Sequence, residues 1–400
     1  MKRLPGSVWI LGVISFFNDV ASEMLYPLLP IFITRVLGAP VAVLGLIDGI
    51  AEGSSALFKV LFGHWSDRVG RRKPFVLLGY VTSSLAKVLI ALSKTWGLVF
   101  VARVFDRFGK GVRTGARDAL LLEASTPSNR GLVFGFQQSL DSAGAVVGPL
   151  IALVLLQVFA DSIRTILFIA IVPSLIGVVL VGFVRESGSR PNYRPTAGVS
   201  NSAVPEKLDL QSLPHELKIF LVVSALFSLG NSSDGFLLLR ARSIGLTLSL
   251  VVLAYICYNV VYSLTSTPAG ILADRFGPRR IYAIGVALYV VVYLGFTFNH
   301  TLAGTWVLFG VYGLYIALTD SVARALVASF VTDQSQAAGI FGLLQSVMSV
   351  GLVAASIVGG ILWSTIGAWA TFAFAALCAL AALSLFVVTE LRQPLTREPS

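Results

Sequence analysis

The chain has 400 residues, of which 56% are hydrophobic and only 12% are charged, and its formal net charge is +10. A soluble domain carries about 25% charged residues, so this composition leaves too little polar surface for a protein surrounded by water. The positive net charge is typical of a membrane protein with Lys and Arg in its cytoplasmic loops, and it predicts no nucleic-acid partner.

Apolar runs predict an all-α membrane protein with twelve transmembrane helices. A span needs about 20 mostly apolar residues to cross the hydrocarbon core as a helix, and no alternating strand pattern recurs along the chain. In chain order, the predicted spans are residues 9–34, 41–63, 74–93, 96–120, 131–157, 163–184, 217–239, 246–269, 281–299, 304–326, 339–363 and 368–389.

One long polar segment divides these spans into two sets. Residues 185–215 contain several Pro, Ser and Gly and predict an exposed linker. We therefore expect an N-terminal six-helix bundle at 1–184 and a C-terminal six-helix bundle at 216–400. Lys and Arg concentrate on the side that holds both termini and the linker, which predicts that this side is cytoplasmic and that the membrane is the inner membrane.

The two sets of spans are an internal repeat. One constant shift aligns the segment after the second span with the segment after the eighth, and aligns the fifth span with the eleventh. The aligned pairs after the second and eighth spans are Gly63 with Gly270, Asp67 with Asp274, Arg68 with Arg275, Gly70 with Gly277, and Arg72 with Arg279. Parallel repeats of this kind form two pseudo-symmetric bundles with a substrate site between them near the midplane.

The segment at 63–73 reads GHWSDRVGRRK, and a second copy occupies 270–280. The first copy follows the pattern G-x-x-x-D-R-x-G-R-R/K-x throughout, and the second departs from it at Pro278, which stands where the first has Arg71. On these two segments the chain resembles the major facilitator superfamily. The resemblance implies transport by alternating access, with this segment governing the change between inward and outward states. Asp67 at the inner end of a span can pair with Arg68 or Arg71 and latch one state; alternatively, the basic cluster only fixes topology. The predicted switch residues are Gly63, Asp67, Arg68, Gly70, Arg71, Arg72, Gly270, Asp274, Arg275, Gly277 and Arg279.

The fifth span carries a second pattern, Gly135, Gly144, Gly148 and Pro149. It resembles the motif of the drug:proton antiporter-like branch of the family, except that the closing pair of glycines is absent. The resemblance implies export by antiport. Without the family, Gly144 and Gly148 predict only a close approach of two helices.

Charged residues inside the predicted spans gather in the first half. A charge within the bilayer costs several kcal/mol, so it must meet a partner or a water-filled cavity. The residues concerned are Asp19, Glu23, Asp48, Glu52, Lys87, Arg103, Asp106, Arg107 and Asp141. We interpret them as a proton-coupling and ion-pair network.

Within this network, Asp19, Glu23 and Asp106 lie nearest to mid-span, and alternate exposure of such a carboxylate to the two sides would carry a proton in each cycle. Arg103 resembles the Arg of the family's span-4 motif R-x-x-Q-G, which implies a part in proton coupling. The alternative is that the charges form structural ion pairs, with Asp48 and Glu52 satisfying Lys87 or Arg103.

Polar and aromatic side chains of both halves are candidates for the substrate cavity. The second half is more apolar and suits a hydrophobic body, although aromatic residues also pack helix interfaces. The candidate cavity residues are Tyr26, Gln137, Gln138, Asp234, Tyr255, Tyr258 and Tyr312.

These patterns predict a secondary transporter that exports a small, partly apolar organic compound in exchange for protons. A symporter or facilitator for a small organic anion or another solute, and a lipid translocase, remain as alternatives. No nucleophile motif, phosphate loop or Cys/His metal cluster occurs, so neither an enzyme nor a metal or cofactor is predicted. A monomer with a small-molecule substrate, protons and the lipid bilayer as partners is expected.

Overall fold

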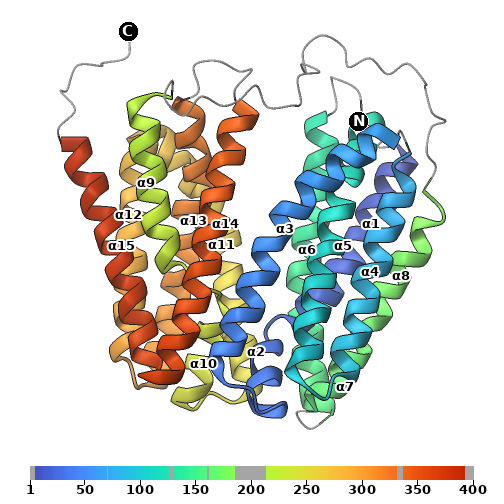
Figure 1. Cartoon of the computed structure of the whole chain (residues 1–400), viewed down its shortest axis with the longest axis horizontal. Coiled ribbons are helices and arrows are strands. Elements are labelled where there is room, and N and C mark those ends of the chain that lie inside the picture. The colour runs from blue at the N-terminus through green and yellow to red at the C-terminus, as the bar shows by residue number, and fades with distance from the viewer. Residues whose placement is uncertain are drawn as a thin grey trace. The chain divides into compact units, whose positions relative to one another are not determined.

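The computed structural model describes residues 5–69, 71–125, 130–159, 162–184, 213–330 and 337–391. Most of the predicted linker and the ends of both termini lie outside these residues. The first half contains α1 (Gly6–Leu25), α2 (Leu29–Ile31), the π-helix η1 (Phe32–Val36), α3 (Val41–Val69), α4 (Lys73–Leu92), α5 (Trp96–Glu123), α6 (Arg130–Val158), α7 (Ile163–Ile169) and α8 (Ile171–Val181) (Figure 1). The second half contains α9 (His215–Gly230), α10 (Gly235–Ile244), α11 (Leu248–Phe276), α12 (Pro278–Phe298), α13 (Leu302–Phe330), α14 (Ala337–Thr365) and α15 (Ala368–Leu391).

These helices make twelve spans, because α1–α2–η1, α7–α8 and α9–α10 are each one interrupted span. The all-α prediction is therefore confirmed. Within the described residues, ten segments are long and apolar enough to cross a membrane. The two spans outside that set are α3 and α5, which have 29 and 28 residues and thus the length of a span, but carry several charged side chains.

Spans 1 and 7 are interrupted at corresponding places of the repeat. In span 1, the turn at 26–28 separates α1 from α2, and Pro27 explains it because proline lacks the N–H donor that continues a helix. In span 7, residues 231–234 separate α9 from α10. The hydropathy of the sequence predicts each span as one continuous segment, so these breaks are a difference between prediction and structure.

The helices group into two compact units whose boundaries differ from those of the repeat. Unit 1 contains α1 to α8, α10 and α11 as far as Ile256, and unit 2 contains α9, α11 from Cys257 onward and α12 to α15. Within unit 1, α10 contacts α2, and the ring of Tyr255 on α11 lies 5.4 Å from that of Tyr26. These contacts explain why two segments of the second half group with the first six spans.

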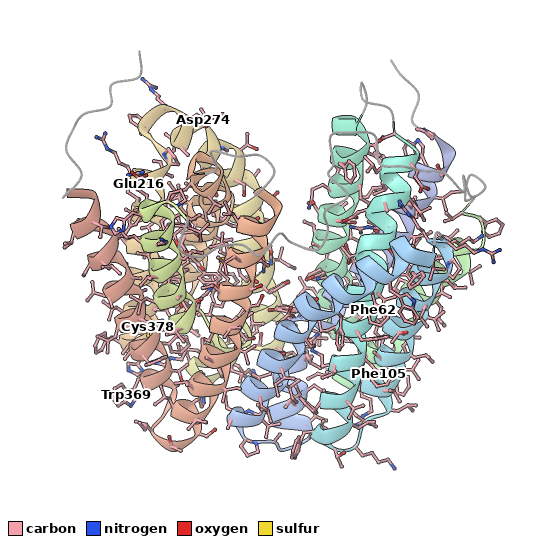
Figure 2. All side chains as sticks on the ribbon, turned by 45° about the horizontal axis from the view of Figure 1, so that its top comes forward. Phe62, Phe105, Glu216, Asp274, Trp369 and Cys378 are labelled. Carbon is pink, nitrogen blue, oxygen red and sulfur yellow. The ribbon has the colours of Figure 1, made fainter. Side chains whose placement is uncertain are left out.

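Helix α12 packs against α13 and α15 in unit 2, and α9 packs against α14 and α15. Stacked aromatic rings fill this unit, with the centroids of Tyr289 and Tyr293 4.0 Å apart. Glu216 and Asp274 lie toward the same end of the unit in Figure 2.

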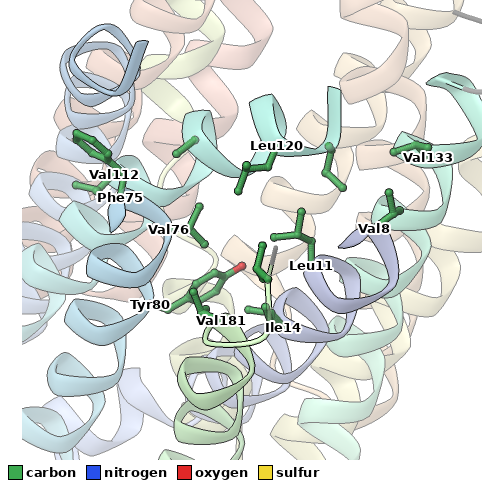
Figure 3. Close-up of a cluster of buried hydrophobic side chains, with 13 residues drawn as sticks. Val8, Leu11, Ile14, Phe75, Val76, Tyr80, Val112, Leu120, Val133 and Val181 are labelled. Carbon is green, nitrogen blue, oxygen red and sulfur yellow. The ribbon is translucent and has the colours of Figure 1, made fainter. Parts of the chain in front are cut away.

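Helix α5 lies against both α3 and α4 in unit 1, while α1 packs on α6 and α8. One apolar cluster joins α1, α4, α5, α6 and α8 (Figure 3). Its labelled members are Val8, Leu11, Ile14, Phe75, Val76, Tyr80, Val112, Leu120, Val133 and Val181. The hydroxyl of Tyr80 lies 3.1 Å from Ser15 Oγ, so the cluster holds α4 and α1 in a fixed relation beside the charged residues.

Candidate functional site

A charged pocket of about 190 Å³ lies within unit 1, between helices α1, α3, α4 and α5. It brings together side chains that are far apart in the sequence and that the sequence marks as candidates. The predicted residues that line it are Asp19, Glu23, Tyr26, Glu52, Lys87, Arg103, Asp106 and Arg107. The two most highly charged spans, α3 and α5, thus contribute most of the charged wall.

Arginines of α5 pair with acids of α3. Arg103 Nη2 lies 3.2 Å from Asp48 Oδ1 and 3.8 Å from Glu52 Oε1. Arg107 Nη2 lies 2.5 Å from Glu52 Oε1. The side chains of Asp48 and Arg103 are each 8% exposed, so removing one member would leave a buried charge without its partner.

Lys87 of α4 and Asp106 of α5 form another buried pair. Lys87 Nζ lies 3.6 Å from Asp106 Oδ1, and the lysine side chain is 2% exposed. Asp106, predicted as a titrating group, is therefore the counter-charge of a buried lysine. Arg103, Asp48 and Glu52 likewise have the ion pairs that a structural role requires.

Asp19 and Glu23 differ from the other acids of the pocket. They are spaced one turn apart on α1, so they share a face of that helix. Glu23 accepts a hydrogen bond of 2.5 Å from the hydroxyl of Tyr255, and Asp19 accepts one of 3.3 Å from Asn18 Nδ2. Among the described residues, neither carboxylate lies within ion-pair distance of a cation.

The span-5 glycines hold α6 directly against this part of α1. A Cβ atom added to Gly144 would lie 2.9 Å from the carbonyl oxygen of Phe16 and 3.0 Å from Asp19 Cβ. A Cβ atom added to Gly148 would lie 2.6 Å from the Val20 carbonyl oxygen and 2.9 Å from Glu23 Cβ. Both glycines therefore permit the backbone of α6 to approach the two carboxylate-bearing residues. Gly135 has open space instead.

Asp141 of α6 lies in a second polar cluster. Its carboxylate is 3.5 Å from Arg117 Nη1 and accepts a 2.8 Å hydrogen bond from Gln137 Nε2. Arg117 also donates to Ser15 Oγ at 2.9 Å. Gln137 is thus buried as the partner of Asp141, whereas Gln138 is exposed.

The remaining aromatic candidates divide between the two units. Tyr255 contacts Glu23 and Tyr26 in unit 1. Tyr258 and Tyr312 are buried in unit 2, where their ring centroids are 5.3 Å apart in an edge-to-face arrangement. Asp234 precedes the first residue of α10.

The switch segments extend helices further than the hydropathy predicts. Because α3 runs to Val69 and α11 to Phe276, most of each segment is helical. Gly277 follows with a φ of 91°, which L-residues other than glycine rarely adopt. Arg72 pairs with Glu123 at 3.1 Å, and Arg279 pairs with Glu216 at 2.6 Å.

The other switch residues fall into two groups. Arg71, Asp274 and Arg275 are exposed, and Gly270 has open space around it. The side chains of Asp67 and Arg68, the surroundings of Gly63 and the whole of Gly70 lie outside what the structure describes.

Two further cations of the pocket, Lys110 and Arg113, are absent from the predicted site. Lys110 is exposed, whereas Arg113 is buried, donates to Ser83 Oγ at 2.6 Å and lies 4.7 Å from the centre of the Tyr80 ring. Their spacing in the sequence could have identified them. Lys110 lies two helical turns after Arg103, and Arg113 lies two turns after Asp106, so each shares a helix face with a predicted site residue.

The pocket offers charged and hydrogen-bonding groups for an organic solute. In the described part of the chain, no group of three His, Cys, Asp or Glu side chains has an arrangement that could hold a metal ion. Ser22, Leu25, Leu29 and Ile90 complete the lining, so the pocket also has an apolar wall.

Comparisons with known proteins agree with this architecture. The family model described as Major Facilitator Superfamily matches residues 11–240 and 220–400. An uncharacterised MFS-type transporter of Methanocaldococcus jannaschii is 35% identical over 368 residues, which cover 90% of this chain and 89% of that protein. The tetracycline resistance protein, class H, of Pasteurella multocida is 22% identical over 294 residues, or 70% of each chain. The crystal structure of the nucleoside transporter NupG matches with a TM-score of 0.78 over 97% of this chain and 99% of that one; at 14% identity, this likeness concerns the fold alone.

Proposed function

Because the chain belongs to the major facilitator superfamily, we propose that it couples proton movement to the export of a small, partly apolar organic compound by alternating access. The chain is a multi-pass membrane transporter and not an enzyme. The proposal concerns the coupling ion, the direction of transport and the residues that carry them.

The observation that carries the proposal is the pair of carboxylates on α1. Asp19 and Glu23 line a pocket, and neither is held in an ion pair by the residues that the structure describes. A carboxylate that is already neutralised by a buried arginine has little reason to take up a proton. The two α1 acids are therefore better suited to binding and releasing protons than Asp48, Glu52 or Asp106.

Export by antiport has two supports. Gly144 and Gly148, which belong to the antiporter-like pattern, hold α6 against α1 beside the two carboxylates. One relative of this chain is named as a tetracycline resistance protein. We also propose that both termini face the cytoplasm of an inner-membrane protein. Arg71 lies between α3 and α4, and Lys73 and Arg280 lie in the first turns of α4 and α12, all on the predicted inner side.

The test is flux into proteoliposomes with an imposed proton gradient. The cargo is a compound that stabilises the purified protein in a thermal-shift screen that includes tetracycline, since a ligand that binds the folded state raises the unfolding midpoint. With an acidic lumen, an antiporter accumulates the compound inside, whereas a symporter accumulates it only when the outside is acidic. We expect accumulation with the acidic lumen.

Asp19→Asn and Glu23→Gln should each abolish accumulation while leaving the fold of the protein intact. Lys94→Met, in the connection between α4 and α5, serves as a control and should transport like the wild type. Gradient-driven accumulation that persists in both acid variants would refute the coupling role of α1.

A further inference from the structure

The charges of the pocket divide into those that neutralise one another and those that do not. Arg103, Arg107 and Lys87 are each paired with an acid of α3 or α5 at 2.5 to 3.6 Å. Four charged residues remain that form no ion pair with any described residue. They are Asp19 and Glu23 on α1, and Lys110 and Arg113 on α5.

The four remaining charges are separated by sign. Both carboxylates belong to α1 and both cations belong to α5, and all four line the same pocket without lying within 4 Å of an opposite charge. A pocket with opposite charges on different helices is complementary to a ligand that itself carries both signs.

The cationic wall has unused hydrogen-bonding capacity. Arg107 is 8% exposed and lines the pocket, and its Nε has no hydrogen-bond partner among the described residues. Arg113 is also buried, but its described partners are a serine hydroxyl and an aromatic ring rather than an acid. Buried guanidinium groups without full pairing are costly, and a carboxylate or phosphate on the ligand would satisfy them.

From this separation of charges, we propose that the transported compound is a small zwitterion, with its cationic group at Asp19 and Glu23 and its anionic group at Lys110 and Arg113. The proposal rests on the proposed transport function and specifies its substrate class. At about 190 Å³, the pocket lies below the ~300 Å³ at which sites for drug-sized ligands begin, so the compound is small. The apolar side chains of Leu25, Leu29 and Ile90 would contact its uncharged middle.

This assignment also explains how exchange with protons would work. A cationic group on the ligand and a proton would compete for the same carboxylates on α1, so one leaves when the other binds. The anionic group would bind Lys110 and Arg113 on α5, which do not take part in that competition, and would leave with the rest of the ligand.

The test compares the binding of charge-matched probes to the purified full-length protein. One set is para-(aminomethyl)benzoate, para-methylbenzylamine and para-methylbenzoate, and a flexible set is ε-aminohexanoate, hexylamine and hexanoate. Each set contains a zwitterion, a cation and an anion on one framework. We expect at least one zwitterion to bind about tenfold more tightly than both of its singly charged analogues, because each lost charge removes a charge-assisted hydrogen bond.

Variants of Lys110 and Glu23 test which residues bind the anionic group and the cationic group of the ligand. Lys110→Met should remove the preference for the zwitterion over the amine, Lys110→Arg should retain it, and Lys94→Met should leave it unchanged. Glu23→Gln should remove the preference over the carboxylate analogue instead. Lys110 is in no described ion pair, so its replacement should leave the fold intact.

The proposal is overturned if no zwitterion binds better than its analogues, or if Lys110→Met leaves the preference unchanged. These measurements use no proton gradient. If no zwitterion preference is found, the substrate proposal fails, but gradient-driven flux can still support the transport proposal. If no gradient-driven flux is found, the transport proposal fails, but a measured zwitterion preference still stands.

Discussion

Residues of one chemical type have different surroundings in this pocket, and the difference separates structural from functional acids. Asp48 is 8% exposed and pairs with Arg103, whereas Asp19 accepts one long hydrogen bond from Asn18 and has no described ion pair. A buried pair that loses one member leaves the other charge uncompensated in a medium of low dielectric constant. Replacing a carboxylate that is in no ion pair leaves no partner charge uncompensated.

Asp48→Asn should therefore lower the stability of the protein by about 3–5 kcal/mol, because Arg103 keeps only its longer contact with Glu52. Asp19→Asn should leave stability close to that of the wild type while it removes gradient-driven flux. Thermal unfolding of the purified variants measures the first effect. An equal loss of stability in both variants would contradict the division between the two acids.

The helical spacing of the acids could be predicted from the sequence, but their pairing could not. Periodicity places Asp19 and Glu23 on one face of α1, and that inference needs no partner helix. Which acid meets Arg103 depends on the rotation of α3 against α5, which only the packing determines. The hydrogen bond between Tyr255 and Glu23 could not be predicted either, because the two residues are 232 positions apart and meet only through helix packing.

At the scale of elements, the contact between α1 and α6 positions the unpaired carboxylates. The sequence pattern indicates that Gly144 and Gly148 allow a close approach, but it does not indicate which helix approaches. In the structure, that helix is α1, and the approach occurs beside Asp19 and Glu23. A change in the separation of these two helices would therefore move the carboxylates relative to the cations of α5.

Gly148→Ala should destabilise the protein by about 1–3 kcal/mol and slow transport, since the new methyl group would lie 2.6 Å from a backbone oxygen of Val20. Gly135→Ala is the matched control on the same helix, because a Cβ atom there meets nothing within 4 Å. Unfolding midpoints and gradient-driven flux of the two variants check this. Equal behaviour would show that the approach of α6 to α1 is not tight.

Element boundaries show where sequence reasoning succeeds and where it fails. Ten of the spans are apolar runs of membrane length, which the sequence predicts directly, whereas α3 and α5 have the length of a span but carry several charged residues. The interruptions at 26–28 and 231–234 could not be predicted, since the residues around them remain apolar enough to read as continuous spans. The grouping of α10 with the first six spans also depends on a packing contact with α2 that has no local signal.

At the scale of the whole molecule, each copy of the repeat has an ion pair between an arginine of its switch segment and a glutamate on another helix of the same unit. Arg72, before α4, pairs with Glu123 at the end of α5. Arg279, in the first turn of α12, pairs with Glu216 in the first turn of α9. The pairs are partly exposed and each contributes only about 0–1 kcal/mol to stability, so a test of the predicted switch has to measure the rate of transport rather than stability.

Arg279→Glu should slow turnover several-fold, because it places two acids together at the α9–α12 contact, while ligand binding stays unchanged. The exchanged pair Arg279→Glu with Glu216→Arg should restore much of the rate. Flux and binding measured on the single and the double variant check this. A loss of affinity without a loss of turnover would count against a role in the transition.

The interruptions in spans 1 and 7 have a mechanical consequence. A continuous helix transmits a tilt from one membrane surface to the other, but a helix whose hydrogen bonding lapses in the middle can bend there. In each of these spans a short non-helical stretch separates two helical segments, with Pro27 in the first stretch and Asn231 in the second. A bend at either stretch would therefore tilt one helical segment of the span without tilting the other.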